Sequence, residues 1–503
     1  MTSRAGSGRD SVRRLLQSGR YLLFWGAVLT SSALRIRINI LGAIIVTVHL
    51  ALALLSYVQA PVLWSGLEHP RAAAFFDSLG IGSWDLFSGN ETVILSQGTP
   101  LALATVAAVL LILMLTRHGH DADAGVAQLL LRWSIAFAAA CFVAFPLFTQ
   151  DFWLSAAWGR MIASGINPFH TLFTGDDLAG LPLDHFPMPM SYGPLWGVLS
   201  ALVALLAWNN AIAMGLLFKV LIAAAWLWSL FLIDAIQRDR PARERCLATA
   251  LFGWVPLGVS QSIAEGHNDI VMIAPALLWL LLLLRNNRWA PIALAASVLC
   301  KYVTAPLFLI DLIHAFRRER LTPLQYAGRM LPAALFGLLF LALFFRSMSF
   351  FDGVRLVSEW YFLRPSEAVS ALEQLLGFHL YPLHLMALAV FPVIAVYWLA
   401  ATVREASTEN LTKATVALMA AILFGAISHL WPWYLVWGVA FGALLPQWWV
   451  SRFIAAVALL VPFTFATWWV PWSEPYRDLA TLAIYAAAGL WIVVTRVPDA
   501  AKR

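Results

Sequence analysis

Apolar stretches long enough to cross a lipid bilayer recur along nearly the whole chain. A membrane-spanning helix needs about 17 to 25 apolar residues, and stretches of this length repeat from about residue 38 to residue 496. Only 12% of the 503 residues are charged and 61% are hydrophobic, whereas an average soluble domain has about 25% charged residues. The sequence therefore predicts an all-α, polytopic integral membrane protein without a large soluble domain.

The spacing of these stretches predicts a bundle of about 13 to 15 membrane helices, some of them short or re-entrant. Asn209 and Asn210 interrupt one stretch and leave the number of crossings around them open. We expect a basic N-terminus with a helix in the membrane interface over residues 1–37, and a single transmembrane domain over residues 38–503. The spans are expected at about 38–58, 99–116, 128–149, 191–208, 211–236, 246–263, 269–285, 289–316, 329–346, 383–403, 412–430, 433–450, 453–470 and 478–496.

Basic residues predict the orientation of the chain in the membrane. Seven arginines precede the first span, whereas the loop over residues 59–98 contains only Arg71. Because Lys and Arg are enriched in cytoplasmic loops, we expect a cytoplasmic N-terminus, and three crossings then place the loop 150–190 on the outer face. The net charge of +6 resides largely in short loops and termini of this kind, so no nucleic-acid partner is expected.

This orientation places four polar segments on the outer face, and we expect the function and some short surface helices there. The cytoplasmic loops contain no phosphate-binding GxxxxGK[ST] motif and no dinucleotide fingerprint, which argues against a soluble nucleotide substrate on the inner side. The four outer segments are residues 150–190, "EGHND" at 265–269, the loop at about 347–382, and "SHLWPWY" at 428–434.

The first candidate residue is Asp151, in "TQDFWLSAAWGRMIASGINPF" at 149–169. A carboxylate in the middle of a bilayer costs roughly 3 kcal/mol, so Asp151 marks a membrane surface. It begins a short amphipathic helix, where an acid also stabilises the helix N-terminus. From the residues alone, both a structural and a catalytic role are open.

Two basic residues are candidates for binding an anion. Lys301 interrupts the apolar stretch 289–316 where the topology requires a turn between two short legs. A lysine there is costly unless it reaches the surface or finds an anion. Arg160 lies on the same short helix as Asp151 and could bind a phosphate or pair with the acids of its own loop. Lys219 stands inside a predicted span, and the sequence assigns it no role.

The segment "EGHND" gathers Glu265, His267, Asn268 and Asp269 between two spans. It is either a polar hairpin or part of a binding site. His267 and Asp269 lack the i, i+4 spacing of a familiar helical metal pair.

Aromatic residues of the outer face offer possible contacts to a sugar. His429, Trp433 and Tyr434 stand in "SHLWPWYLVW", and Tyr192 stands in "SYGPLW", whose Gly-Pro pair favours a bend. Tryptophan and tyrosine commonly form belts at the membrane interface, but their faces also suit the C–H bonds of sugar rings. The aromatic residues therefore have two open interpretations.

The order of these motifs resembles a known family. "AAWGRMIASGINPF", "SYGPLW", "EGHNDIVM", "LCKYVTAPLFL" and "HLWPWYLVW" follow one another over about residues 128–450. This arrangement resembles the GT-C superfamily of polyprenyl-phosphate-sugar-dependent glycosyltransferases. The order and wording are closest to the bacterial polyprenol-phosphate-mannose-dependent alpha-1,6-mannosyltransferases.

The resemblance implies an activity and a location. We expect a multi-pass protein of the bacterial inner membrane with a GT-C-like helix bundle. It would transfer mannose from a polyprenyl-phosphate-mannose lipid to a glycan or glycolipid acceptor on the outer face, with inversion at the anomeric carbon. Its partners would be these two substrates and the membrane lipids.

The resemblance also implies roles for the candidate residues. Asp151 would be the general base, with Asp269 or Glu265 in reserve, and Lys301 and Arg160 would bind the donor phosphate. Sugar or acceptor binding is expected of a larger set, Tyr192, Glu265, His267, Asn268, Asp269, His429, Trp433 and Tyr434.

The sequence implies no certain cofactor. Relatives carry two acids near the catalytic point, whereas this chain has Gln150 beside Asp151. A metal clamp made of adjacent carboxylates is therefore not expected, although a divalent metal remains open. The departing lipid phosphate mainly needs cations and hydrogen-bond donors around its oxygens.

Two other classes of protein remain open. Many-helix proteins with charges inside the membrane often transport substrates, so a flippase of lipid-linked sugars is one alternative, although the chain shows no clear internal repeat. A membrane oligosaccharide polymerase or ligase is the other, and would depend more on outer-face arginines.

Overall fold

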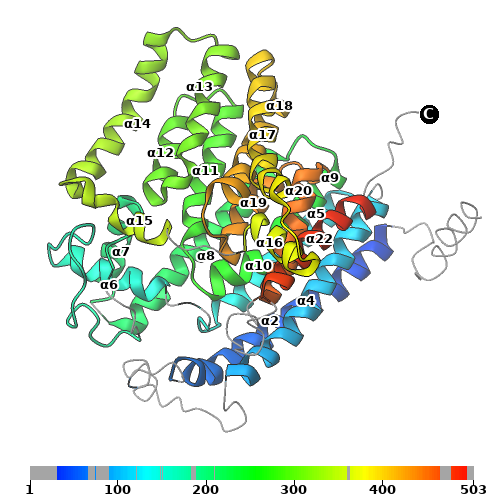
Figure 1. Ribbon diagram of the computed structural model, residues 1–503, viewed down its shortest axis with the longest axis horizontal. Helices are drawn as coiled ribbons and strands as arrows, with labels where there is room; N and C mark the ends of the chain where they lie inside the picture. The colour runs from blue at the N-terminus through cyan, green and yellow to red at the C-terminus, as the bar shows by residue number, and fades with distance from the viewer. Residues whose placement is uncertain are drawn as a thin grey trace, which may run out of the picture.

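The computed structural model describes residues 31–65, 74, 90–119, 122–147, 149, 151–182, 188–208, 210–358, 363–464 and 477–495. Throughout these residues the chain is helical, without a β-strand, which confirms the predicted all-α class (Figure 1). The helices are α2 (Ser31–Ser65), α4 (Asn90–His118), α5 (Ala124–Phe142), α6 (Asp151–Ala163), α7 (Pro194–Leu206), α8 (Ala211–Ile236), α9 (Ala242–Gly253), α10 (Pro256–Val259), η3 (Ser260–Ala264), α11 (Asp269–Leu284), α12 (Ala290–Cys300), η4 (Tyr302–Leu307), α13 (Phe308–Arg317), α14 (Pro323–Phe344), η5 (Met348–Phe351), α15 (Asp352–Ser358), α16 (Pro365–Leu376), α17 (Tyr381–Arg404), α18 (Thr408–Ala421), η6 (Ile422–Ala426), η7 (Pro432–Tyr434), α19 (Leu435–Gly442), α20 (Trp449–Leu460), η8 (Val461–Thr464) and α22 (Arg477–Val494).

Six helices in the described part of the chain are long and apolar enough to cross a membrane, namely α2, α4, α5, α8, α14 and α17. A seventh crossing results if α9 and the α10–η3 segment, which meet at a bend of 53°, form one broken span. The remaining apolar helices, such as α7, α11 and α12, are shorter. The predicted count of about 13 to 15 spans is therefore not confirmed, because hydropathy does not distinguish a crossing helix from a short helix buried in the protein.

Prolines explain two differences between the predicted and observed helices. The stretch expected at about 128–149 ends as α5 at Phe142, shortly before Pro146. The stretch at about 246–263 bends just before Pro256, which begins α10. A proline disfavours the helical conformation of the residue before it, so helices commonly end at or before that residue.

The structure tests only part of the predictions for the N-terminus and the outer loops. Residues 1–30 of the predicted interfacial segment lie outside the described residues, and residues 31–37 belong to α2. The outer segment at about 347–382 contains the short helices η5, α15 and α16. The short helices expected in this segment are thus confirmed, and its location on the outer face stays a prediction.

Basic residues gather where several helices begin. Arg35 of α2 pairs with Asp123, ahead of α5, at 2.8 Å. Lys413 and, less strongly, Arg240 lower the pKa of Glu409 at the start of α18. We call this region, which includes Arg35 and Arg240, the basic end of the bundle. Helix α5 begins there, next to Asp123, and its 19 residues extend roughly 28 Å. Its far end leads into the segment that contains Asp151.

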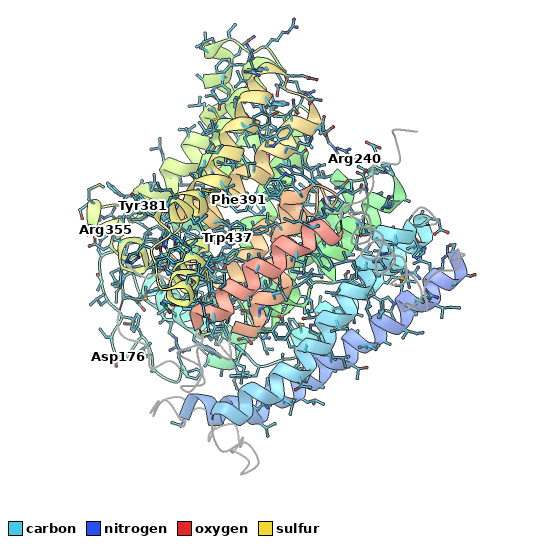
Figure 2. The ribbon with its side chains drawn as sticks, turned by 45° about the vertical axis from the view of Figure 1, so that its right-hand side comes forward. Asp176, Arg240, Arg355, Tyr381, Phe391 and Trp437 are labelled. Atoms are coloured by element: carbon cyan, nitrogen blue, oxygen red, sulfur yellow. The ribbon has the colours of Figure 1, made fainter. Side chains whose placement is uncertain are left out.

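Figure 2 shows how the basic end and the outer loop lie relative to the interior. Trp437 appears in the middle of the bundle, with Arg240 on one side and Asp176 on the other. Trp437 is fully buried. Asp269, Lys301 and Tyr434 contact its ring.

Candidate active site

Helix α6 carries Asp151 at its first residue and is buried almost throughout. The sequence predicts a short amphipathic helix at the surface, but every side chain from Phe152 to Met161 is buried. Close packing against α7 explains the difference: a Cβ atom on Gly159 would lie 2.3 Å from the carbonyl oxygen of Ser200. Only glycine allows the two backbones to approach so closely, so the surface assignment of this helix is corrected.

The carboxylate of Asp151 remains accessible although its helix is buried. Its Oδ2 atom accepts a hydrogen bond from Tyr192 Oη at 3.3 Å and lies 3.2 Å from His267 Nδ1. About a third of the Asp151 side chain is exposed, at 32%, whereas the His267 side chain is 2% exposed. The structure therefore places an accessible carboxylate between a half-buried phenol and a buried imidazole.

The "EGHND" segment reaches this carboxylate through a backbone turn. Gly266 has a φ of +79°, and a Cβ atom there would lie 2.8 Å from the ring of Phe152. Glycine alone adopts this conformation readily. The turn places His267 next to Asp151 at the start of α6. The buried Asn268 is the residue that immediately precedes α11. Glu265 accepts the backbone N–H of Leu147 at 3.0 Å.

The Lys301 side chain is buried in the protein, where its ammonium has an anionic partner. The apolar stretch divides at this residue, as the sequence predicts, because an extended backbone at Lys301 separates α12 from η4. Its Nζ atom donates to Asp269 Oδ1 at 2.7 Å, and Trp437 donates to the same oxygen at 2.6 Å. The ammonium also lies 4.3 Å from the ring centroid of Tyr434 and 5.1 Å from that of Trp437.

Tyr192 connects the carboxylate of Asp151 to the ammonium of Lys301. Its hydroxyl donates to Asp151, and its ring centroid lies 5.2 Å from Lys301 Nζ. Burial, and next the negative charge of Asp151, raise the pKa of Tyr192, so the phenol keeps its proton at neutral pH. The N–H of Gly193 donates to the carbonyl oxygen of Cys300 at 2.9 Å, which fixes this segment against the end of α12.

The "SHLWPWY" segment supplies a stack of aromatic rings. Trp433 stacks on His267 with ring centroids 3.9 Å apart and on Trp431 with centroids 4.7 Å apart. His429 Nε2 lies 3.3 Å from the hydroxyl of Tyr434. The structure thus brings His429, Trp433 and Tyr434 to the same place as the "EGHND" segment.

Arg160 holds the outer loop against α6. Its guanidinium donates to the carbonyl oxygens of Asp177 and Ala179 at 3.1 and 2.6 Å. Its side chain is buried. These contacts identify a role in loop structure, and binding of the donor phosphate by Arg160 stays a prediction.

Lys219, to which the sequence assigns no role, bonds three backbone carbonyl groups. Its Nζ atom donates to Ala144 at 2.5 Å, to Ile263 at 3.0 Å and to Ala264 at 3.1 Å. These carbonyls lie after the end of α5 and at the end of η3. A buried lysine thus satisfies polar backbone groups at the ends of two helices.

We expect Lys219→Met to lower the free energy of unfolding by about 1 to 3 kcal/mol, because buried carbonyl groups lose their donor. Thermal unfolding of the detergent-purified protein measures the effect. Lys413→Met is the control, because its i, i+4 pair with Glu409 contributes only about 0.3 to 0.5 kcal/mol. Equal unfolding temperatures for the two variants would contradict the structural role of Lys219.

Trp437 belongs to the site although the sequence gives it little weight. Its indole N–H holds the carboxylate of Asp269, and its ring faces the ammonium of Lys301. Residues three apart share a helix face, so its spacing from Tyr434 was an available signal. The abundance of tryptophan, 24 in the chain, hides that signal.

The residues described around Asp151 do not resemble a metal-binding set. Asp151 and His267 supply one carboxylate and one imidazole, and the described part of the chain contains no group of three or more His, Cys, Asp or Glu residues that could hold a metal ion. Gln150 lies outside the described residues.

A family comparison identifies the enzyme class. The family model described as "Alpha-(1->6)-mannopyranosyltransferase, N-terminal domain" matches residues 81–316, which include Asp151, Tyr192, residues 265–269 and Lys301. No curated protein and no solved structure matches the chain. The family match supports the enzyme over the transporter and ligase alternatives. The resemblance drawn from the motifs is confirmed over residues 81–316: this part of the chain is similar to the N-terminal domain of the alpha-(1->6)-mannopyranosyltransferases, which supports a mannosyltransferase of the GT-C type.

Proposed function

We propose that the enzyme transfers mannose from a polyprenyl-phosphate-mannose lipid to a glycan or glycolipid acceptor, with Asp151 as general base and Lys301 as the cation for the donor phosphate. One observation carries this proposal. Asp151 and Lys301 contact the same phenol, Tyr192, one at its hydroxyl and the other at its ring face. The carboxylate proposed to accept the proton and the buried ammonium of Lys301 therefore both lie next to Tyr192.

The proposed reaction inverts the anomeric carbon in a single displacement. The acceptor hydroxyl oxygen forms a bond to this carbon and passes its proton to Asp151. The bond from the carbon to the phosphate oxygen breaks, and its electron pair stays on the phosphate. A β-linked donor then gives an α-linked product, as the resemblance to the family implies.

Lys301 suits the phosphate because the lipid phosphate gains one negative charge when the sugar leaves. Its ammonium has three donors, of which Asp269 takes one. The remaining N–H groups are proposed to face the phosphate oxygens, where a preorganised donor stabilises the developing charge. Since Asp269 Oδ1 is held by Lys301 and Trp437, Asp151 is a better base than Asp269. The accessible side chain of Asp151 supports the same choice over the buried Glu265.

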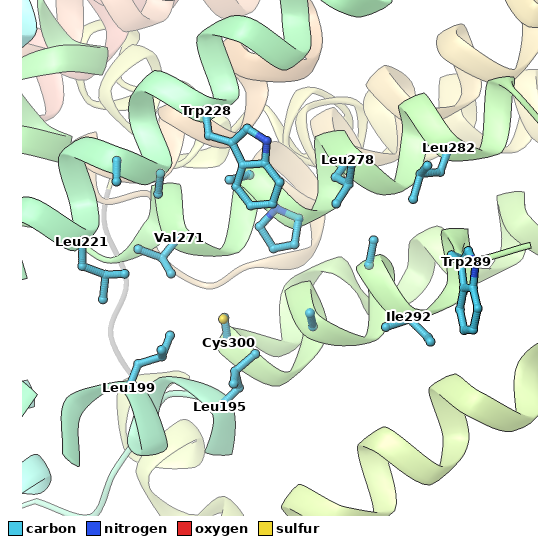
Figure 3. A pocket seen from close by; sticks show the side chains of 16 residues that line it. Leu195, Leu199, Leu221, Trp228, Val271, Leu278, Leu282, Trp289, Ile292 and Cys300 are labelled. Carbon is cyan, nitrogen blue, oxygen red and sulfur yellow. The ribbon is translucent and has the colours of Figure 1, made fainter. Parts of the chain in front are cut away.

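An apolar groove fits the polyprenyl tail of the donor (Figure 3). It has a volume of about 810 Å³ and runs between α8 and α11 on one side and α7 and α12 on the other. Along α11 its wall extends from Val271 to Leu282, which is roughly 17 Å at 1.5 Å per residue. Trp289 lies at the far end, away from Cys300.

The near end of the groove adjoins the polar site at three points of the chain. Cys300 lines the groove and precedes Lys301, Val271 follows two residues after Asp269, and Leu195 follows three residues after Tyr192. A lipid with its phosphate at Lys301 can therefore place its tail directly in the groove. Each buried methylene contributes about 0.8 kcal/mol, which favours a long prenyl chain as the occupant.

We expect Ala296→Trp to raise the KM for a long-chain donor roughly tenfold, because the indole would displace about two methylenes of tail contact. The KM for a donor with a short prenyl chain should change little. Ala296 lines the groove, whereas the control Ala400→Trp alters an exposed position on α17. Equal effects on both donors, or no difference from the control, would contradict tail binding in this groove.

The proposed reaction takes place on the outer face of the bacterial inner membrane. Helix α5 connects the basic end of the bundle to the segment of Asp151, and basic residues favour the cytoplasmic side. Labelling of single cysteines introduced at Asp176 and at Arg240 in intact cells, with a reagent that does not cross membranes, tests this orientation.

The proposed function is tested with purified protein, radiolabelled polyprenyl-phosphate-mannose and an α-mannoside acceptor. We expect a radiolabelled product that an α-mannosidase digests, together with the release of polyprenyl phosphate. Product formation from a soluble nucleotide sugar alone would contradict the proposed donor. Movement of the lipid across proteoliposomes without formation of a glycosidic bond would contradict the transfer reaction.

A further inference from the structure

His267 contacts the proposed base through one nitrogen while the rest of its ring is enclosed. Its Nδ1 atom lies 3.2 Å from Asp151 Oδ2, and its ring stacks on Trp433 at an interplanar angle of 14°. The residue is 1% exposed. Its Nε2 atom is buried and has no hydrogen-bond partner among the residues that the structure describes.

This environment selects one protonation state of the imidazole. Nδ1 must carry a hydrogen in order to donate to the carboxylate of Asp151. A hydrogen on Nε2 as well would create a buried imidazolium with an unsatisfied N–H, which carries a high desolvation cost. An Nε2 lone pair without a partner costs less, so the neutral Nδ1–H tautomer fits this site best.

We infer that His267 is a positioning residue, a neutral Nδ1–H donor that fixes the carboxylate of Asp151 for proton transfer and does not itself accept the proton. This inference rests on the proposed role of Asp151 as general base. His267 and Tyr192 both bond Oδ2, and two donors on one oxygen hold the orientation of the carboxylate. A positive charge at His267 would make Asp151 less basic, so a neutral donor preserves its function.

The charged and titratable groups around His267 agree with this assignment. Asp151 faces it from α6, and Tyr192 donates to the same carboxylate from the loop ahead of α7. Asp269, two residues along the chain, is held by the ammonium of Lys301. Trp433, which stacks on the ring, is uncharged. The segment 267–269 therefore carries both His267, beside the proposed base, and Asp269, which pairs with the lysine proposed to bind the phosphate.

Three substitutions of similar size distinguish the roles of the two nitrogens. In His267→Asn the side-chain amide can place an N–H where Nδ1 lies, and it cannot titrate. In His267→Gln the amide reaches the position of Nε2, and His267→Leu removes the donor. We expect His267→Asn to keep kcat within about tenfold of the wild type, and the other two to lose about a hundredfold, the effect of a misplaced catalytic group.

Further measurements separate positioning from a general loss of structure. The acceptor KM should change little in all three variants, so that the loss appears in kcat. The control His379→Asn alters a side chain that is 96% exposed and should behave as the wild type. Thermal unfolding of each variant establishes that it is folded.

Several outcomes would overturn the inference. If His267→Asn is as inactive as His267→Leu, either the ring itself is needed or Nε2 accepts the proton. If all three variants match the wild type, Asp151 needs no fixed donor.

A spectroscopic measurement does not depend on the activity. In protein labelled with 15N-histidine, the signals that disappear in His267→Asn should show, at neutral pH, a neutral ring protonated at Nδ1. An Nε2–H tautomer or a doubly protonated ring at that pH would contradict the inference. Failure of mannosyl transfer with this tautomer present would instead count against the proposed function.

Discussion

Replacing Asp151 by asparagine is expected to lower kcat for mannosyl transfer by about 10²- to 10⁴-fold, the contribution of a positioned general base. The amide is nearly the same size as the carboxylate but does not accept a proton from the acceptor hydroxyl. The helix should persist, since one negative charge at a helix N-terminus contributes only about 0.3 to 1 kcal/mol. Initial rates at saturating donor lipid and acceptor measure the effect.

Asp176→Asn is the matched control for this substitution. Asp176 is exposed in the outer loop, so its replacement should leave kcat unchanged. Transfer by Asp151→Asn at a rate within a few-fold of the wild type would show that the carboxylate only stabilises the start of α6. Asp269 and Glu265 would then be examined as bases, despite their burial.

Replacing Lys301 by methionine is expected to lower kcat/KM for the donor by about 10²- to 10³-fold, the usual effect of removing one donor from a developing negative charge. The substitution also leaves Asp269 as a buried carboxylate without its cation. Breaking a buried ion pair on one side commonly costs about 3 to 5 kcal/mol of stability. The variant must therefore be measured for unfolding as well as for transfer.

A double variant separates these two effects. Lys301→Met combined with Asp269→Asn removes both charges, and the amide can still accept the hydrogen bond from Trp437. We expect it to recover much of the unfolding temperature while transfer stays low. Recovery of transfer together with stability would show that Lys301 only maintains the structure and does not act on the phosphate.

The sequence predicts the class of the fold and most of the residues that the site brings together. The hydropathy pattern identifies the helical membrane protein, and polar residues in apolar surroundings, such as Lys301 and Asp269, point to the interior site. Such residues are costly in a membrane, so each of them requires a partner. The structure provides it: these two residues pair with each other.

Other features depend on tertiary packing and are not readable from the chain. The burial of α6 follows from its contact with α7 at Gly159, and the hydrophobicity of the helix does not reveal it. Lys219 resembles Lys301 in the sequence, yet it bonds only carbonyl groups in its described contacts. The number of spans is not confirmed for a related reason, because short helices such as α11 are largely buried in protein and need not match the thickness of a bilayer.

In the proposed donor complex, helix α11 would connect the binding site of the sugar to that of the lipid tail. It begins at Asp269, beside the reacting groups, and its side forms the groove wall from Val271 onward. Each residue of an α-helix advances the chain by 1.5 Å and turns it by about 100°. One residue inserted after Asp269 would therefore rotate the hydrocarbon-binding surface away from the tail while the headgroup stayed in place. If the groove holds the lipid tail as proposed, helix geometry would set the distance and rotation between the two ends of the lipid, and the enzyme would tolerate exchange of one apolar side chain for another along α11 far better than a change in its length.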